Sequence, residues 1–364
     1  MRSKQVIFRS ALLGLAVGDA MGHAVDRLTL EEIQNDYGPN GLLGYDLVNG
    51  FAEVTSYTQL AAFTANGLLL GLTRQQLQGK MAPLVRYIGL ATKEWSRSQQ
   101  YSEPERNYCW LSTVPELKRR RCMDTRMLDA INRGLGTTED PIFRSDSPGN
   151  LTAVIPVALL SRMVIMPQED IDRLGADTIA LLCGNPDTFL TGATLTHLLS
   201  LLLQDPDMSL REALRITRNA IQQQFGREFS QTTYLWEMLQ HAEVLSRAPK
   251  FTQVEAMERL RCRTAPEVLC GALYACLTSG DDFDAALITA VNHSGRSAAV
   301  GAITGAIMAI RMGETALPEF YLECLEAAPL LSELADDMAQ GCPMDSTSRL
   351  FDDDWDRKYL RGGV

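Results

Sequence analysis

Two short segments hold the side chains best suited to chemistry in this chain. One is Val54-Thr-Ser-Tyr-Thr-Gln-Leu60, and the other is Val291-Asn-His-Ser-Gly-Arg-Ser297. Arg296 stands just before a helix expected to begin near Ser297, where the positive end of the macrodipole disfavours a cation. Backbone N–H groups at a helix start, together with a guanidinium, form a good site for a phosphate or carboxylate. Arg296, with Ser294 and Gly295, is therefore a candidate to hold an anion.

A second interpretation of the same residues remains open. Arg296 can fold back onto an internal acid such as Asp26, Asp46 or Glu53. Tyr57 can stack on a ligand ring, or it can fill space inside the protein. For both residues, the internal role is the favoured interpretation.

The remaining reactive side chains match no known catalytic pattern. His23, His197 and His241 have no acidic, Ser or Cys partner that the sequence can place. The cysteines include no Cys-x-x-Cys pair and lie at no zinc-ligand spacing from a histidine, so buried free thiols are expected. Gly38-Pro-Asn-Gly-Leu-Leu-Gly44 matches neither a dinucleotide fingerprint nor a P-loop, and a turn is expected there.

Charge and hydropathy restrict the class of protein further. The net charge of −11 argues against nucleic-acid binding, which requires a basic surface. The basic run Lys118-Arg-Arg-Arg121 is expected to be a solvated helix face, and a phosphate-binding patch is the alternative. The N-terminus resembles a signal peptide, but Arg9 interrupts it and Asp19 ends the apolar run early, so a packed first helix is expected. No other segment approaches the length of a membrane span, and we expect a cytoplasmic protein.

The apolar residues recur at helical spacing along nearly the whole chain. Helix starts are indicated by the Thr29–Glu32 capping box, by Pro266 and by Asp281 or Asp282. A last core helix is expected over Ser297 to Met312, with small residues on one face that allow close helix approach. These patterns predict one compact all-α domain over residues 1–345. Residues 346–364, which carry Trp355 and Tyr359, are expected to form a surface tail.

Two stretches of the chain resemble the ADP-ribosylglycohydrolase family. One is the opening Ala11-Leu-Leu-Gly-Leu-Ala-Val-Gly-Asp-Ala-Met-Gly22, and the other runs from Asp282 through Gly295 to Val300-Gly-Ala-Ile-Thr-Gly305. The resemblance covers roughly residues 7 to 340 and is specific at its two ends. It implies a single all-α domain that holds two magnesium ions in a cleft and releases ADP-ribose from modified side chains or related adducts. It also implies a structural hydrogen bond for His293.

The positions that this resemblance assigns to the metal ions hold no carboxylate. The family's Thr/Ser-Asp-Asp-Thr motif aligns with Thr55-Ser-Tyr-Thr58, and its Gly-Asp-x-Asp-Ser/Thr motif aligns with Gly295-Arg-Ser-Ala-Ala299. The phosphate loop, which includes Gly149 and Asn150, lacks the family's arginine, and Leu182-Cys-Gly-Asn-Pro186 lacks its histidine. Asp26 is the shorter counterpart of a family glutamate.

These substitutions predict that the family's magnesium ions are lost and that no cofactor is bound. Mg²⁺ requires oxygen ligands, usually carboxylates, whereas here Arg296 adds a positive charge. At an effective dielectric near 20, one unit charge at about 4 Å is worth roughly 4 kcal/mol, which hydroxyl groups do not offset. Activation of water by the metals would be lost with them.

Three hypotheses for function follow. The favoured one is a catalytically inactive homologue that binds an ADP-ribose-like or other anionic ligand, or a protein partner, through its cleft. The second is a metal-independent or weak hydrolase of an ADP-ribosyl or N-glycosidic bond, in which Asp26, Asp46 or Glu53 supplies acid–base chemistry. The third is a structural or interaction protein with a plugged cleft. The predicted ligand-binding residues are Thr55, Ser56, Tyr57, Gly149, Asn150, Ser294, Gly295, Arg296 and Ser297.

Overall fold

The fold is helical, as the sequence predicts. The computed structural model describes residues 2–79, 82–100, 107–122, 124–148, 151–248, 250–313, 317–346 and 350–363. Within these ranges, β-structure is limited to isolated bridges between Val48 and Phe51, Ala52 and Leu325, and Asp345 and Leu350. None of the helices in the described ranges is long and apolar enough to cross a membrane.

The α-helices follow one another along the chain with short 3₁₀ turns between some of them. They are α1 (Lys4–His23), α2 (Leu30–Tyr37), α3 (Ser56–Gln78), α4 (Leu84–Gln99), α5 (Pro115–Lys118), α6 (Thr125–Arg133), α7 (Val154–Leu159), α8 (Gln168–Ala180), α9 (Pro186–Gln204), α10 (Leu210–Phe225), α11 (Gln231–Leu245), α12 (Gln253–Leu260), α13 (Ala265–Ser279), α14 (Phe283–Val291), α15 (Ser297–Met312), α16 (Glu319–Cys324), α17 (Ala328–Gln340) and α18 (Asp353–Tyr359). The 3₁₀ turns are η1 (Trp110–Thr113), η2 (Leu151–Ala153) and η3 (Leu160–Arg162).

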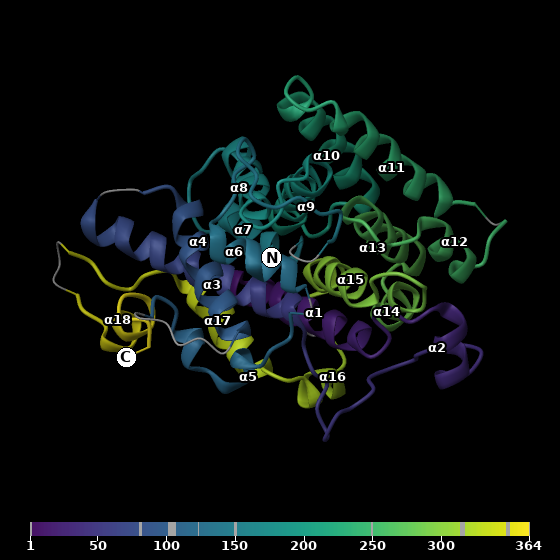
Figure 1. Ribbon diagram of the computed structural model, residues 1–364, viewed down its shortest axis with the longest axis horizontal. Coiled ribbons are helices and arrows are strands. Elements are labelled where there is room, and N and C mark those ends of the chain that lie inside the picture. Colours follow the sequence, from purple (N-terminus) through teal and green to yellow (C-terminus); the bar gives the residue numbers. More distant parts are fainter. Residues whose placement is uncertain are drawn as a thin grey trace.

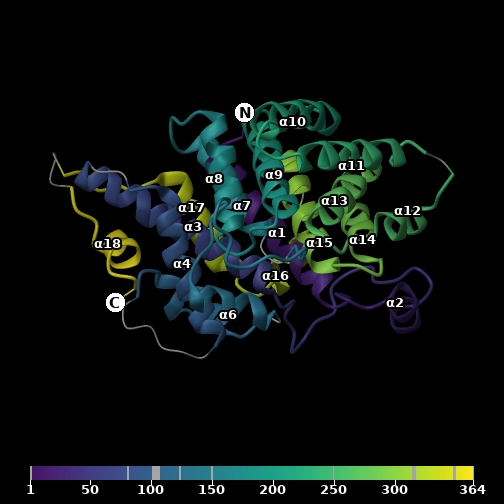
Figure 2. The ribbon, with the colours of Figure 1, turned by 45° about the horizontal axis from the view of Figure 1, so that its top comes forward.

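Helices α1 and α15 pack against each other in the middle of the molecule (Figures 1 and 2). Their backbones approach closely because glycines of α1 face small residues of α15. A Cβ atom added to Gly18 would lie 1.9 Å from the carbonyl oxygen of Gly301, and one added to Gly14 would lie 2.4 Å from that of Gly305. The predicted close approach along the small face of α15 is confirmed, and so is a packed first helix.

The other helices surround this pair. Helices α13 and α14 pack against α15, while α17 packs against α1 and also contacts α3. At one end of the molecule, α18 docks on α3 and buries Trp355 and Tyr359 (Figure 1). The indole N–H of Trp355 donates a hydrogen bond to the Thr73 hydroxyl at 2.9 Å. The C-terminal segment therefore adds to the core, and its separation from the domain at residue 345 stays a prediction.

Several helix starts lie where the local sequence places them. Thr29 and Glu32 form the predicted capping box of α2, and the Asp282 side chain caps α14. Pro266 lies in the first turn of α13. Helix α15 spans Ser297–Met312, the range predicted from its spacing.

The prediction that residues 118–121 form a solvated helix face is wrong about the helix, although Lys118, Arg119 and Arg120 are exposed. Helix α5 ends at Lys118, and the chain leaves it before Arg119 and Arg121. Both arginines make ion pairs with Glu53 and Glu326, and the Arg121 side chain is only 12% exposed. These partners are distant in sequence, which is why a local charge pattern gave no sign of them.

The α1–α15 contact predicts a strong effect of a single methyl group. Gly18→Ala should lower the free energy of unfolding by about 3 kcal/mol, because the added Cβ overlaps the α15 backbone and forces the two helices apart. Urea denaturation would measure the loss. Gly44→Ala is the matched control, since a Cβ there meets no atom within 4 Å. Equal stability of the two variants would contradict this account of the core.

Candidate functional site

A cleft opens where α1 ends and where α3 and α15 begin, and its volume is about 510 Å³. The first turn of α6 contributes another part of its wall. The residues that line it are His23, Asp26, Arg27, Thr55, Ser56, Tyr57, Arg121, Cys122, Asp124, Thr125, Arg126, Met127, Ser147 and Arg296. The structure thus brings together five of the predicted site residues, namely Asp26, Thr55, Ser56, Tyr57 and Arg296.

The start of α3 is held by a carboxylate that the sequence analysis did not single out. Asp19, fully buried on α1, accepts hydrogen bonds from the backbone N–H and hydroxyl of Thr55 at 2.8 and 2.7 Å. It also accepts bonds from the backbone N–H and hydroxyl of Thr58 at 3.1 and 2.6 Å. Burial raises the pKa of the Asp19 carboxyl, and the hydrogen bonds from Thr58 and Thr55 offset part of that rise. Both threonine hydroxyls therefore point into the protein.

Asp26 plays a similar part at the start of α15. Its carboxylate accepts a hydrogen bond from the backbone N–H of Ala298 at 3.2 Å, which places a negative charge at the helix N-terminus. Its other oxygen lies 3.5 Å from the Arg27 guanidinium and 3.9 Å from that of Arg296. Burial raises the pKa of Asp26, while the nearby Arg296 acts in the opposite direction.

Arg296 is the residue that precedes α15, and it faces the cleft. Of the three acids considered as internal partners, Asp26 alone lies within ion-pair distance of Arg296. Asp46 accepts a hydrogen bond from Tyr37, and Glu53 pairs with arginines of the 119–121 segment. Within the described part of the chain, the Arg296 guanidinium makes no hydrogen bond, so its donors remain available to a ligand.

Three predicted ligand-binding residues lie outside the cleft wall. The Ser294 hydroxyl accepts a hydrogen bond from the backbone N–H of Leu30 at 2.9 Å, at the start of α2. Gly295 packs against the turn at residues 261–262, where an added Cβ would lie 2.6 Å from two carbonyl oxygens. The Ser297 hydroxyl is buried and donates to the His293 carbonyl at 3.4 Å. All three make contacts that support the loop before α15.

Tyr57 is described by the structure, whereas the two predicted residues of the phosphate loop are not. Tyr57 forms part of the cleft wall but is only 7% exposed, and its backbone carbonyl accepts a hydrogen bond from the Thr152 hydroxyl at 2.7 Å. This burial agrees with a space-filling role. Gly149 and Asn150 lie outside the described residues.

The structure adds three arginines to the site that sequence reasoning did not assign to it. Arg27 follows Asp26 directly, in the turn after α1, and has a positive φ of 70°. Arg121 and Arg126 enter from the segment before α6 and from its first turn. The sequence offered a signal for Arg27, which neighbours Asp26, and for Arg121, because a phosphate-binding patch is the alternative interpretation of its basic run. Arg121 and Arg126 reach the cleft through the tertiary fold.

His293 stabilises the loop that carries Arg296. Its Nε2 lies 2.9 Å from the Ala290 carbonyl oxygen, and its Nδ1 accepts the backbone N–H of Gly295 at 2.9 Å. A carbonyl only accepts, so Nε2 must carry the proton and Nδ1 must be free. The structural hydrogen bond expected for His293 is present. Burial lowers the pKa of His293 to about 4, since a second proton would be desolvated and would break the bond from Gly295.

The depressed pKa of His293 predicts a pH-dependent stability. The unfolded state, with a His pKa near 6.5, binds the proton more tightly than the folded state. Neutral His293 therefore contributes fully to the free energy of unfolding above about pH 6.5. This contribution is lost as the pH falls towards 4, by about 3 kcal/mol in total. Urea titrations of wild type and His293→Gln across this window should show their stabilities converging as the pH falls. Parallel curves would contradict the assignment.

The chain was compared with protein families, curated proteins and solved structures. Residues 3–347 match the family model described as ADP-ribosylglycohydrolase. An uncharacterised protein of Archaeoglobus fulgidus is 26% identical over 345 residues, which cover 90% of this chain and 94% of that protein. A solved structure described as an ADP-ribosylglycohydrolase-related protein complex has the same fold, with a TM-score of 0.55 and 20% identity over 93% of this chain and 99% of the other. Because the family match spans nearly the whole chain, this protein belongs to the ADP-ribosylglycohydrolase family.

Proposed function

We propose that this protein binds an anionic, ADP-ribose-like ligand in the cleft without magnesium and without hydrolysing it. The observation that carries the proposal is the excess of guanidinium groups over carboxylates in the cleft wall. Arg27 and Arg296 both lie near one carboxylate, Asp26, which also caps α15. Asp26 lies beyond hydrogen-bond distance of both guanidinium groups. A phosphate placed between the two arginines would accept charge-assisted hydrogen bonds from them.

The side chains at the family's metal-binding positions do not fit a pair of magnesium ions. Thr55 and Thr58 direct their hydroxyl protons to Asp19, and Arg296 brings a positive charge to the second motif. Among the described residues, no group of three or more His, Cys, Asp or Glu side chains is placed to hold a metal ion. Two divalent cations need several carboxylates nearby to offset their mutual repulsion. The proposed function therefore involves no metal ion.

The size and lining of the cleft support a nucleotide-sized ligand. Its volume of about 510 Å³ falls within the roughly 300–1,000 Å³ typical of small-molecule sites. Met127 and the buried Tyr57 supply apolar wall, while the arginines supply positive charge. The three helix starts in the cleft, those of α3, α15 and α6, already have carboxylates in Asp19, Asp26 and Asp124, so the guanidinium groups would provide the anion contacts.

ADP-ribose should raise the melting temperature of this protein equally with magnesium and with EDTA. A free concentration about 100 times Kd stabilises the folded state by about 2.7 kcal/mol. Arg296→Ala should remove most of the shift because it deletes the guanidinium with free donors. Arg247→Ala, at an exposed site on the loop after α11, is the matched control and should leave the shift unchanged. Thermal unfolding followed by fluorescence gives the measurement.

Two results would contradict the proposal in different ways. A shift in melting temperature that requires magnesium would show that the cleft binds the metal after all. The absence of any shift, with or without magnesium, would instead favour an interaction protein whose cleft takes no small ligand.

Slow hydrolysis without a metal is the second candidate function. It is favoured by the position of Asp26, the one of the three proposed acids that lines the cleft. Because burial raises the pKa of Asp26, its carboxyl is better suited to act as a general acid near neutral pH. Asp26→Asn should then abolish release of ADP-ribose from an ADP-ribosylated peptide, measured by chromatography, while leaving ADP-ribose binding intact. Hydrolysis that survives this change would exclude Asp26 as the acid.

A further inference from the structure

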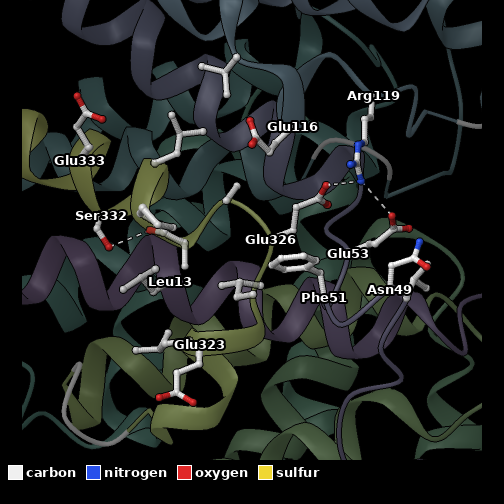
Figure 3. Close-up of a pocket in the computed structure, with 18 residues that line it drawn as sticks. Leu13, Asn49, Phe51, Glu53, Glu116, Arg119, Glu323, Glu326, Ser332 and Glu333 are labelled. Carbon is white, nitrogen blue, oxygen red and sulfur yellow. Dashed lines mark hydrogen bonds and ion pairs between the residues drawn. The ribbon is translucent and has the colours of Figure 1, made fainter.

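A second and larger concavity lies outside the cleft, with a volume of about 970 Å³ (Figure 3). We name it the acidic groove. It is bordered by the segment 48–53, by α5 and α16, and by the start of α17, and Leu13 of α1 lies at its base. It shares no lining residue with the candidate site.

The border of the acidic groove carries exposed apolar side chains. Phe51 is 56% exposed and Val48 is 49% exposed, both on the segment that lines the groove. Leu43 and Leu47, earlier in the same loop, and Phe320 on α16 are also exposed. Exposed large apolar residues that gather on adjoining segments mark a binding surface more often than single ones do.

The charges of the acidic groove are almost all negative. Its lining contains the glutamates at 53, 116, 323, 326 and 333, with Arg119 as the cation (Figure 3). Arg119 pairs with Glu53 and Glu326, and Glu333 pairs with Lys358. Among the residues that the structure describes, Glu116 and Glu323 have no ion-pair partner, and both are exposed. They approach the groove from different elements, α5 and α16, so they can engage charges at two points of one bound segment.

We propose that the acidic groove is the docking site for a basic, amphipathic polypeptide segment of a protein partner. Large apolar side chains of the segment would pack on Val48 and Phe51, and its lysines or arginines would pair with Glu116 and Glu323. Charge complementarity selects this occupant, since a nucleic acid or an acidic peptide would be repelled.

A second copy of this chain fits the groove less well. The chain carries a net charge of −11, so most of its own surface would be repelled by Glu116 and Glu323. Two arginines of its basic run, Arg119 and Arg121, are already held in ion pairs with Glu53 and Glu326. A basic segment from another protein meets neither obstacle.

Fluorescence anisotropy with the full-length protein tests the proposal directly. The probe is a labelled 18-residue helical peptide of leucine and lysine, and the reference probe replaces every lysine with glutamate. Only the lysine peptide should bind. The double variant Glu116→Lys/Glu323→Lys should weaken that binding at least tenfold, and Phe51→Ser, which removes the apolar contact without changing the charge, should weaken it as well. Glu237→Lys/Asp129→Lys, which makes the same charge change at exposed positions outside the groove, should bind like wild type.

Several outcomes would overturn the proposal. One is equal binding of the lysine peptide to the groove variant and to the control variant, since it would show attraction by net charge alone. Another is failure of the peptide to bind wild type. If sedimentation shows that wild type self-associates and that Phe51→Ser makes it monomeric while peptide binding is unchanged, a second copy occupies the groove instead. Melting temperatures close to wild type would confirm that each variant is folded.

Discussion

The close contact between α1 and α15 is the constraint on which the rest of this structure depends. Glycines on both helices let the backbones meet where any larger side chain would separate them. This contact fixes the end of α1 beside the start of α15. The carboxylates of Asp19 and Asp26, which lie near that end, then reach the starts of α3 and α15. The position of the cleft is thus a consequence of helix packing in the core.

Charge is distributed unevenly around this framework. The three helix N-termini at the cleft are capped by Asp19, Asp26 and Asp124, and four arginines in the lining outnumber the two carboxylates there. The acidic groove has the opposite sign. Between the two lies an ion-pair network in which Glu53 and Glu326 contact both Arg119, on the groove, and Arg121, on the cleft. The two surfaces therefore share one wall of paired charges.

Helix starts and helix bounds were predicted accurately from local sequence. The bounds of α15 and the cap of α2 depend on residues within a few positions of each other, so a sequence pattern contains them. The partners of Arg119 and Arg121 are distant in sequence, so the local charge pattern did not predict their ion pairs. Ser294 and Ser297 are neighbours of Arg296 along the chain, yet their hydroxyls make internal contacts. Proximity in sequence did not imply a shared surface.

The sequence by itself determined the helical architecture and the small face of α15 that lets another helix approach closely. These properties reside in residue type and spacing. The tertiary structure alone decided that Asp26 is the acid near Arg296, that Arg27, Arg121 and Arg126 join the cleft, and that glutamates from separate helices border one groove. The physical reason is that ion pairs and cavities form between segments far apart in the chain, and their positions follow only from how the helices pack.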